Sequence, residues 1–188
     1  MSQESDPLVS IPVDGVELEG ELLVPTDAAG VVLFAHGSGS SRHSPRNNYV
    51  AEVLRERGVG TLLFDLLTEA EDEDYVTRFD IDLLTARLLA ATEWLRGREV
   101  GEDARLGYFG SSTGAAAALR AAAARGPDVA AVVSRGGRVD MASDALAEVE
   151  AATLFVIGGA DTQVLELNRE AFESLTGERE LHVVEGAG

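Results

Sequence analysis

Ser112 lies at the centre of the sequence GSSTG, which spans residues 110–114. An apolar run precedes this segment and an alanine-rich run follows it, an order that predicts a strand, a tight turn and a helix. Glycines relieve the crowding of such a turn, which can expose the serine hydroxyl as a nucleophile for acyl transfer. Serine is also a preferred residue at the N-cap of a helix. The segment therefore predicts either a nucleophile or a helix cap, and its own residues do not decide between them.

A glycine-rich segment, HGSGSS, spans residues 36–41 and also follows an apolar run. The backbone N–H groups of such a loop can point into a cleft and stabilise the negative oxygen that develops during acyl transfer. We expect the backbone amides of Ser38 and Thr113 to be these donors. A phosphate-binding loop is the alternative, but the segment lacks the Lys-Ser or Lys-Thr ending of a P-loop and the glycine spacing of a dinucleotide-binding loop. The oxyanion interpretation is therefore favoured.

Asp161 directly follows a late apolar run and comes after Ser112 in chain order. This is the position expected for the acid that orients the histidine in a Ser-Asp-His system. The alternative is that Asp161 caps a helix that begins near Gln163. Asp65 and Asp140 also follow predicted strands, but only Asp161 lies at the penultimate strand–helix junction. We therefore expect Asp161 to be the acid.

The elements that must position these residues alternate along the chain. Strands are predicted at residues 30–37, 60–66, 104–110, 129–137, 152–159 and 180–186, and helices at residues 44–58, 76–98, 115–126 and 164–177, with a short one near Ala145. This order predicts a mostly parallel sheet wrapped by helices, in a single α/β domain over residues 1–188. An Asp14-Gly15 turn predicts an antiparallel hairpin at the N-terminal edge, and the acidic run at 68–75 predicts a solvated loop. Ligands of such sheets bind beyond the carboxyl ends of the strands, which is where the candidate residues lie.

Composition excludes several classes of function. The formal net charge is −18, and all 15 basic residues are arginine. An acidic surface without lysine favours a halophilic protein of a high-salt cytoplasm, although ordinary acidic solubility is the alternative. A nucleic acid would be repelled by this charge. The absence of cysteine excludes disulfides, thiolate zinc sites and a cysteine nucleophile. The polar start and the lack of an apolar run of about 20 residues predict a cytoplasmic protein without a membrane partner.

Three segments, FAHGSGSSRHSPRN, GYFGSSTGAAAAL and FVIGGADTQVLELNR, occur in this order and together resemble the α/β-hydrolases. The chain is most similar, over nearly its whole length, to the small uncapped members grouped with the dienelactone hydrolases. The resemblance implies a three-layer α/β sandwich without a cap domain. It also implies that Ser112 is the nucleophile, Asp161 the acid, and Ser38 and Thr113 the oxyanion donors. Dienelactone hydrolases proper use a cysteine nucleophile, and this chain has no cysteine, so we expect serine-esterase chemistry rather than activity on dienelactones.

In this family the catalytic histidine stands directly after the last strand, and the given sequence stops there, at Gly188. We therefore expect both the histidine and a C-terminal helix to lie beyond Gly188. His182 falls inside the predicted last strand, and His36 is better suited to bracing the glycine-rich loop. His43 lies in a loop at the active edge and is the candidate for a substitute base, although nearby arginines oppose a second cation.

The expected reaction is hydrolysis of a small ester or lactone through an acyl-enzyme, without a metal or another cofactor. Arg42 and Arg46 could attract a substrate carboxylate. A non-catalytic binding or scaffold protein with this fold is the alternative, and acyl transfer to an alcohol is a further one. A sheet face left without a helix could be covered by a second copy of the chain, as a homodimer.

Overall fold

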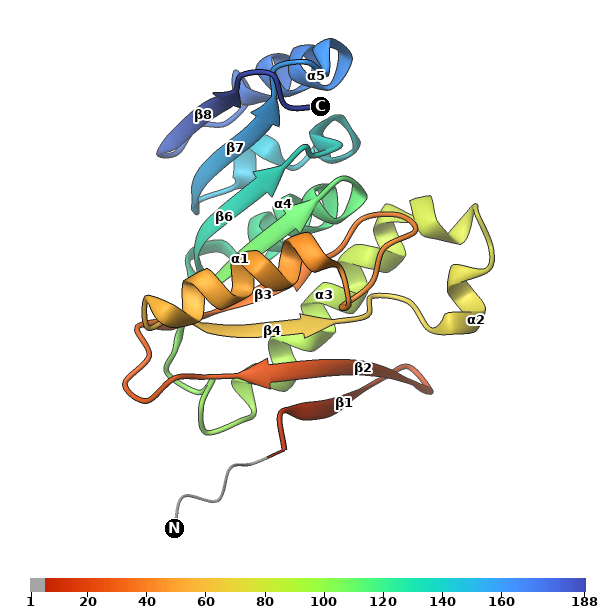
Figure 1. Cartoon of the computed structure of the whole chain (residues 1–188), viewed down its shortest axis with the longest axis vertical. Helices are drawn as coiled ribbons and strands as arrows, with labels where there is room; N and C mark the ends of the chain where they lie inside the picture. Colours follow the sequence, from red (N-terminus) through yellow and green to blue (C-terminus); the bar gives the residue numbers. More distant parts are fainter. Residues whose placement is uncertain (1–5) are drawn as a thin grey trace.

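A computed structural model describes residues 6–188, which form one eight-stranded sheet (Figure 1). The strand order is β1-β2-β4-β3-β5-β6-β7-β8. The strands are β1 (Leu8–Val13), β2 (Val16–Leu23), β3 (Gly30–Ala35), β4 (Gly60–Phe64), β5 (Arg105–Ser111), β6 (Val129–Arg135), β7 (Ala152–Gly158) and β8 (Arg179–Val184). The β1–β2 and β2–β4 pairs are antiparallel, and all the other pairs are parallel. The predicted mostly parallel sheet with an antiparallel N-terminal edge is confirmed.

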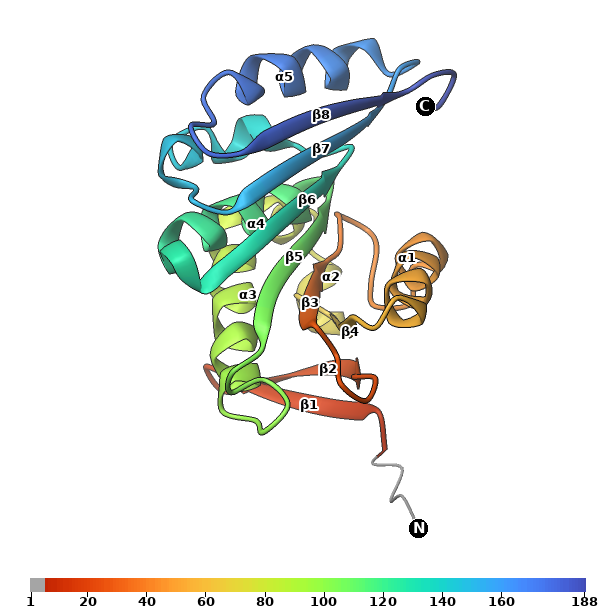
Figure 2. The same cartoon turned by 90° about the vertical axis from the view of Figure 1, so that its left-hand side faces the viewer.

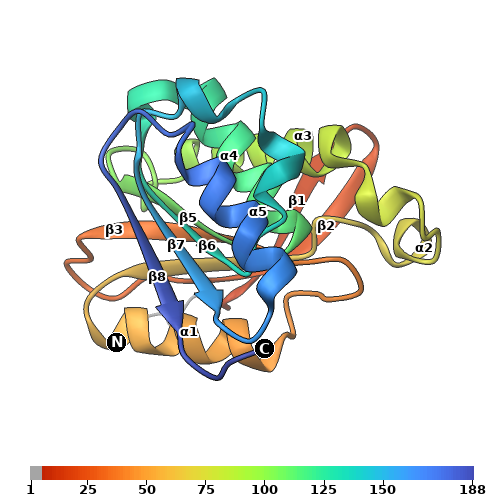
Figure 3. The same ribbon diagram turned by 90° about the horizontal axis from the view of Figure 1, so that it is seen from above.

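The helices lie on both faces of the sheet and complete three layers (Figures 2 and 3). The longer ones are α1 (Pro45–Glu56), α3 (Ile81–Arg96), α4 (Thr113–Arg125) and α5 (Thr162–Phe172). Helices α3, α4 and α5 share one face, where the main hydrophobic core lies, and α1 covers the other. The core under α1 is a separate small cluster of Phe34, Ala51, Leu63 and Phe109. All five residues of β4 are buried, as expected for a strand that is covered on both faces.

The α1 face is only partly covered. Within residues 6–188, no helix packs on this face of β7 and β8 (Figure 2). Thr153, Phe155 and Ile157 are buried toward α5, so the alternate residues of β7 point to the opposite side and are only half-buried. Val184 on β8 is 40% exposed. The predicted uncovered sheet face is therefore present.

The expectation of a solvated loop at residues 68–75 is wrong, because a short helix, α2 (Glu69–Asp72), forms there. The Thr68 hydroxyl accepts a hydrogen bond from the Glu71 N–H, and the Glu71 carboxylate accepts one from the Thr68 N–H. Glu71 also forms a two-point ion pair with Arg87, a buried residue of α3. Hydrogen bonding to the Arg87 guanidinium lowers the pKa of Glu71 to about 2. The capping and the buried arginine outweigh the repulsion among the acidic side chains.

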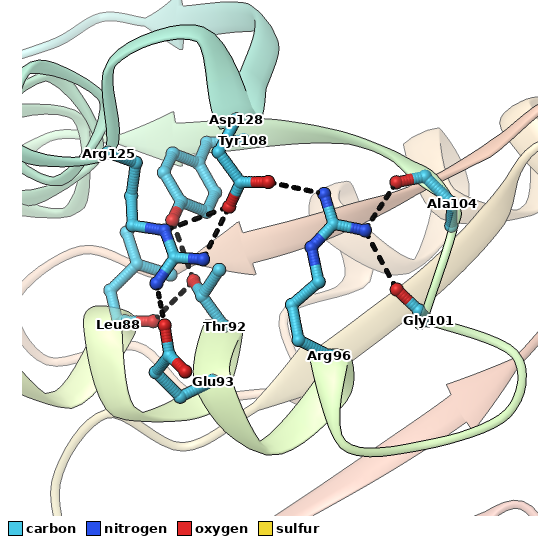
Figure 4. Close-up of polar contacts among 9 residues, drawn as sticks. All are labelled: Leu88, Thr92, Glu93, Arg96, Gly101, Ala104, Tyr108, Arg125 and Asp128. Carbon is cyan, nitrogen blue, oxygen red and sulfur yellow. Dashed lines mark hydrogen bonds and ion pairs between the residues drawn. The ribbon is translucent and has the colours of Figure 1, made fainter.

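A polar cluster joins α3 to the sheet and to the end of α4 (Figure 4). Arg96 donates hydrogen bonds to the carbonyls of Gly101 and Ala104 and pairs with Asp128 at 2.7 Å. Asp128 also pairs with Arg125, the last residue of α4. On β5, the Tyr108 hydroxyl lies 2.6 Å from that of Thr92, and burial raises the pKa of Tyr108 to about 12. The cluster fixes the C-terminal end of α4, the helix whose other end follows Ser112.

Candidate active site

Ser112 forms the turn between β5 and α4 and adopts a backbone conformation that side chains rarely accept, with φ 52° and ψ −124°. It occupies the N-cap position of α4, but its side chain makes no capping hydrogen bond. The interpretation of this serine as a side-chain helix cap is therefore wrong. Its carbonyl accepts hydrogen bonds from the N–H groups of Ala115 and Arg138, which hold the turn. The side chain is half-buried, so the hydroxyl is not sealed in the core.

Two glycines allow the turn to pack closely. A Cβ at Gly110 would lie 2.5 Å from the Ala115 Cα, so β5 and α4 could not approach as they do. A Cβ at Gly37, in the loop after β3, would lie 2.9 Å from the Ser112 Cβ. The glycine-rich loop is therefore in direct contact with the Ser112 side chain, as its predicted role requires.

The strain at Ser112 predicts that glycine at this position stabilises the protein. A residue with a Cβ in this region of backbone space costs on the order of 1–3 kcal/mol, whereas glycine adopts it freely. We expect the free energy of unfolding of Ser112→Gly to be about 1 kcal/mol higher than that of Ser112→Ala. Ser112→Ala is the matched control, because alanine keeps the Cβ. Urea denaturation of both variants measures the difference. A Ser112→Gly variant that is less stable than Ser112→Ala would contradict the strain.

Ser112 and Asp161 line the same hollow, of about 570 Å³, at the carboxyl ends of β5, β6 and β7. We call it the Ser112 hollow. Its lining residues are Arg46, Ser111, Ser112, Arg135, Gly136, Val156, Ile157, Gly158, Asp161, Val164, Val184, Ala187 and Gly188. Within the described part of the chain, Asp161 is the only acidic residue of this lining.

Asp161 also acts as a helix cap. It is the N-cap residue of α5, and its carboxylate accepts a hydrogen bond from the Val164 N–H at 3.2 Å. Its two rivals lie elsewhere, since Asp65 pairs with Arg42 and Asp140 pairs with Arg138. Of the three candidate acids, only Asp161 therefore shares a hollow with Ser112.

The two predicted oxyanion donors lie together. Ser38 and Thr113 line one narrow gap, which His36 and Gly37 also line. Neither the Ser38 N–H nor the Thr113 N–H has a hydrogen-bond acceptor among residues 6–188. Thr113 is the first residue of α4, where backbone N–H groups are without helical partners. Both amides therefore lack an internal acceptor among the described residues.

None of the three histidines within residues 6–188, His36, His43 and His182, lines the Ser112 hollow. The buried His36 ring donates from Nδ1 to the Gly37 carbonyl and accepts at Nε2 from the Leu66 N–H, so both nitrogens are used. Burial lowers its pKa and keeps the ring neutral. His43 is exposed and lines a second hollow, together with Asp65 and acidic residues of β2. The structure therefore does not bring His43, the suggested substitute base, into the Ser112 hollow, because its loop turns toward β2 and β4 rather than toward β6.

Arg42 does not line the Ser112 hollow either. Its guanidinium lies 2.5 Å from the Asp65 carboxylate and 3.1 Å from that of Glu19, in the second hollow. These two carboxylates neutralise the charge that was expected to bind substrate. The structure therefore does not bring Arg42, the predicted substrate-binding residue, into the Ser112 hollow.

Sequence reasoning missed Arg135, which lines the Ser112 hollow from the end of β6. The available signal was its place directly after an apolar run, the same rule that pointed to Asp161.

No group of three or more histidine, aspartate or glutamate side chains in residues 6–188 is arranged to hold a metal ion. None of the described helices is long and apolar enough to cross a membrane.

Several known proteins are similar to this chain in sequence or in structure. No family model matches the chain. Two curated proteins from strains of Mycobacterium tuberculosis, provisionally named phosphoribosyl transferases, are 52% identical over 182 residues, which are 97% of this chain and 41% of theirs. The chain thus spans less than half the length of these relatives. The esterase Est1E from Butyrivibrio proteoclasticus shares the fold, with a TM-score of 0.82 at 16% identity over 96% of this chain and 89% of that one.

A solved structure of a dienelactone hydrolase from Anabaena variabilis is much more similar in sequence. It is 51% identical, with a TM-score of 0.93, and the match covers 96% of this chain and 86% of that one. Identity at this level over nearly the whole of both chains, together with the turn at Ser112 and the order of the candidate residues, shows that the chain belongs to the dienelactone hydrolase family of α/β-hydrolases.

Proposed function

We propose that this protein hydrolyses small carboxylic esters through an acyl-enzyme, with Ser112 as the nucleophile. The observation that carries the proposal is the strained turn at Ser112, whose hydroxyl does not cap the helix. Ser112 lines the same hollow as Asp161, and its side chain packs against the glycine-rich loop. Strained backbone of this kind persists where the surrounding structure enforces it, and it is concentrated at active sites. The esterase and hydrolase titles of the structural neighbours agree with this reaction class.

In the proposed mechanism, the Ser112 Oγ attacks the carbonyl carbon of the ester and the hydroxyl proton passes to a base. The carbonyl oxygen becomes an oxyanion, which accepts hydrogen bonds from the free N–H groups of Ser38 and Thr113. The bond to the alcohol oxygen then breaks, and the base returns its proton to that oxygen. Water attacks the resulting acyl-enzyme by the same route and releases the carboxylic acid.

The base in this mechanism is a histidine that Asp161 orients. We assign it to a residue outside residues 1–188, as the family resemblance implies, because His36, His43 and His182 do not line the Ser112 hollow. The Asp161 carboxylate lies on the lining of that hollow and uses one oxygen to cap α5. Its second oxygen can accept a hydrogen bond from an imidazole.

Labelling with a fluorophosphonate probe tests the proposal in the protein expressed at the full length of its gene. Fluorophosphonates react with activated serines, so we expect one labelled peptide, the one that contains Ser112. Mass spectrometry of the digested protein identifies it. A protein that is folded but unlabelled would instead favour the non-catalytic scaffold. Product analysis with added alcohol separates hydrolysis from acyl transfer to that alcohol.

A further inference from the structure

We propose that Asn168, on α5, is a positioning residue of the active site, which fixes the turn that carries Asp161 relative to the turn that carries Ser112. The inference rests on the proposed function and deepens it, because the acid can orient a histidine toward Ser112 only if its distance from Ser112 is set. Asn168 does not line the Ser112 hollow, so it acts through Asp161 rather than on the substrate.

Asn168 lies where the helical pattern of α5 predicts an apolar side chain. The buried residues of this helix are Leu165, Asn168 and Ala171, which recur every three residues on one face. Asn168 itself is fully buried, with 0% of its surface exposed. The helix packs against β7 and against a short 3-10 helix, η3 (Val139–Ala142), which follows β6. A polar side chain is therefore buried where α5 meets the segment after β6.

The side-chain amide of Asn168 joins two carbonyls from different parts of the chain. Its Nδ2 donates to the Val164 carbonyl at 2.8 Å, in the first turn of α5, and to the Gly137 carbonyl at 3.0 Å, in the loop after β6. The nitrogen rather than the oxygen must face both carbonyls, because only the nitrogen can donate. Val164 also donates its own N–H to the Asp161 carboxylate. Asn168 therefore connects the turn that Asp161 caps to the loop after β6.

The loop after β6 is in turn fixed to the Ser112 turn. Arg138, the residue after Gly137, donates its N–H to the Ser112 carbonyl at 3.0 Å. A Cβ at Gly137 would lie 2.7 Å from the Cβ of Ala115 in α4, so the loop packs closely against that helix. Within residues 6–188, no other side chain of α5 forms a hydrogen bond to this loop. Loss of the Asn168 amide should therefore release the Asp161 turn and leave the Ser112 turn in place.

Stability alone gives no reason for an asparagine at this position. Its Oδ1 is buried without a hydrogen-bond partner within residues 6–188, and an unsatisfied buried acceptor costs free energy. Leucine, of similar size, would instead leave the Gly137 carbonyl without a donor, because no other hydrogen bond reaches that carbonyl from these residues. One oxygen is unsatisfied in either case, and leucine would bury more apolar surface. The link that the asparagine makes is therefore the better explanation for it.

Asn168→Leu tests the link, because leucine fills a similar space without a donor. In the protein expressed at the full length of its gene, we expect kcat for 4-nitrophenyl valerate to fall about ten- to a hundredfold, since a misplacement of about 1 Å can cost this much. KM should change less than about twofold, because Asn168 is not part of the lining of the hollow. Thr85→Val is the matched control, because it removes a buried hydrogen bond, from the Thr85 hydroxyl to the Ile81 carbonyl, within α3. It should leave kcat and KM unchanged.

A double-mutant cycle with Asp161→Asn separates positioning from a general loss of structure. Asparagine keeps an oxygen that can cap α5 but removes the acid. If Asn168 acts by placing that acid, Asn168→Leu should lower kcat less than about twofold in the Asp161→Asn background. A loss as large as in the wild type would overturn the proposal, and so would an unchanged kcat in Asn168→Leu alone. In both cases, hydrolysis of the ester by the wild type would still support the proposed function. If circular dichroism shows that Asn168→Leu is unfolded, Asn168→Ala replaces it in the same cycle, because alanine cannot overpack the site.

If the wild type hydrolyses no ester, the proposed function fails, and hydrogen exchange measured by NMR tests the link alone. The probe is the Leu165 N–H, which closes the first turn of α5 on the Asp161 carbonyl. Asn168→Leu should speed the exchange of this amide at least about tenfold, because the turn has lost its connection to the loop after β6. Thr85→Val should leave the exchange rate unchanged. Exchange at the wild-type rate in Asn168→Leu would overturn the proposal.

Discussion

Replacing Ser112 by alanine is expected to lower kcat/KM for 4-nitrophenyl valerate by at least about a thousandfold, while the protein stays folded. The loss is large because the hydroxyl is the group that forms the covalent intermediate. The neighbouring Ser111 also lines the hollow, but it is the last residue of β5 and does not occupy the strained position of the turn. The free amides of Ser38 and Thr113 remain, so a small residual rate above that of water is expected. Spectrophotometric assays of 4-nitrophenol release by the full-length protein measure the effect, and circular dichroism checks that the variant is folded.

Ser41→Ala is the control for this experiment. Ser41 is also half-buried, but it lines the second hollow, where its hydroxyl accepts a hydrogen bond from the His43 N–H. Its removal should leave the rate and the fluorophosphonate labelling unchanged. A Ser112→Ala protein that kept most of its activity would exclude Ser112 as the nucleophile. Labelling of Ser41 in the wild type would instead show that the active site is the second hollow.

Much of the fold followed from the sequence because the signals were local. The apolar runs of β4 and β3 are buried as predicted, and Asp14-Gly15 turns β1 into β2 as an antiparallel pair. The exception is α2, whose stability depends on Arg87, a residue of the next long helix. A contact between residues that are far apart in the chain could not be predicted from the acidic run itself.

The candidate site could be predicted in part for a related reason. Chain order places Ser112 and Asp161 at the carboxyl edge of the sheet, and this was enough to pair them. Chain order does not predict to which side of β3 each residue of the long loop after this strand turns. Strand β4 lies on one side of β3 and β5 on the other. Arg42 turns toward β4 and pairs with Asp65, whereas Arg46, four positions later, lines the hollow at β5 and β6. The two hollows therefore separate arginines that the sequence placed together.

Gly114→Ala is expected to destabilise the protein by about 3 kcal/mol or more, a shift of roughly 6–12 °C in the unfolding temperature for a domain of this size. A Cβ at this position would lie 2.1 Å from the carbonyl oxygen of Ala35 and 2.5 Å from that of His36. Neither atom can move easily, because Ala35 is paired with Gly110 in the sheet and His36 is hydrogen-bonded through both ring nitrogens. Helix α4 would have to shift away from β3, which would separate the Thr113 amide from that of Ser38.

Gly97→Ala provides the comparison for this thermal-unfolding experiment. Gly97 follows α3 with an ordinary φ of −76°, and a Cβ there would lie 3.4 Å from its nearest neighbour, the Trp94 carbonyl oxygen. We expect a change of less than about 1 kcal/mol, because alanine fits this conformation and also restricts the unfolded chain. If Gly114→Ala and Gly97→Ala had the same unfolding temperature, the result would contradict the close approach of α4 to β3. The placement of the Ser112 turn against the glycine-rich loop depends on that approach, so the proposed oxyanion site would be wrong with it.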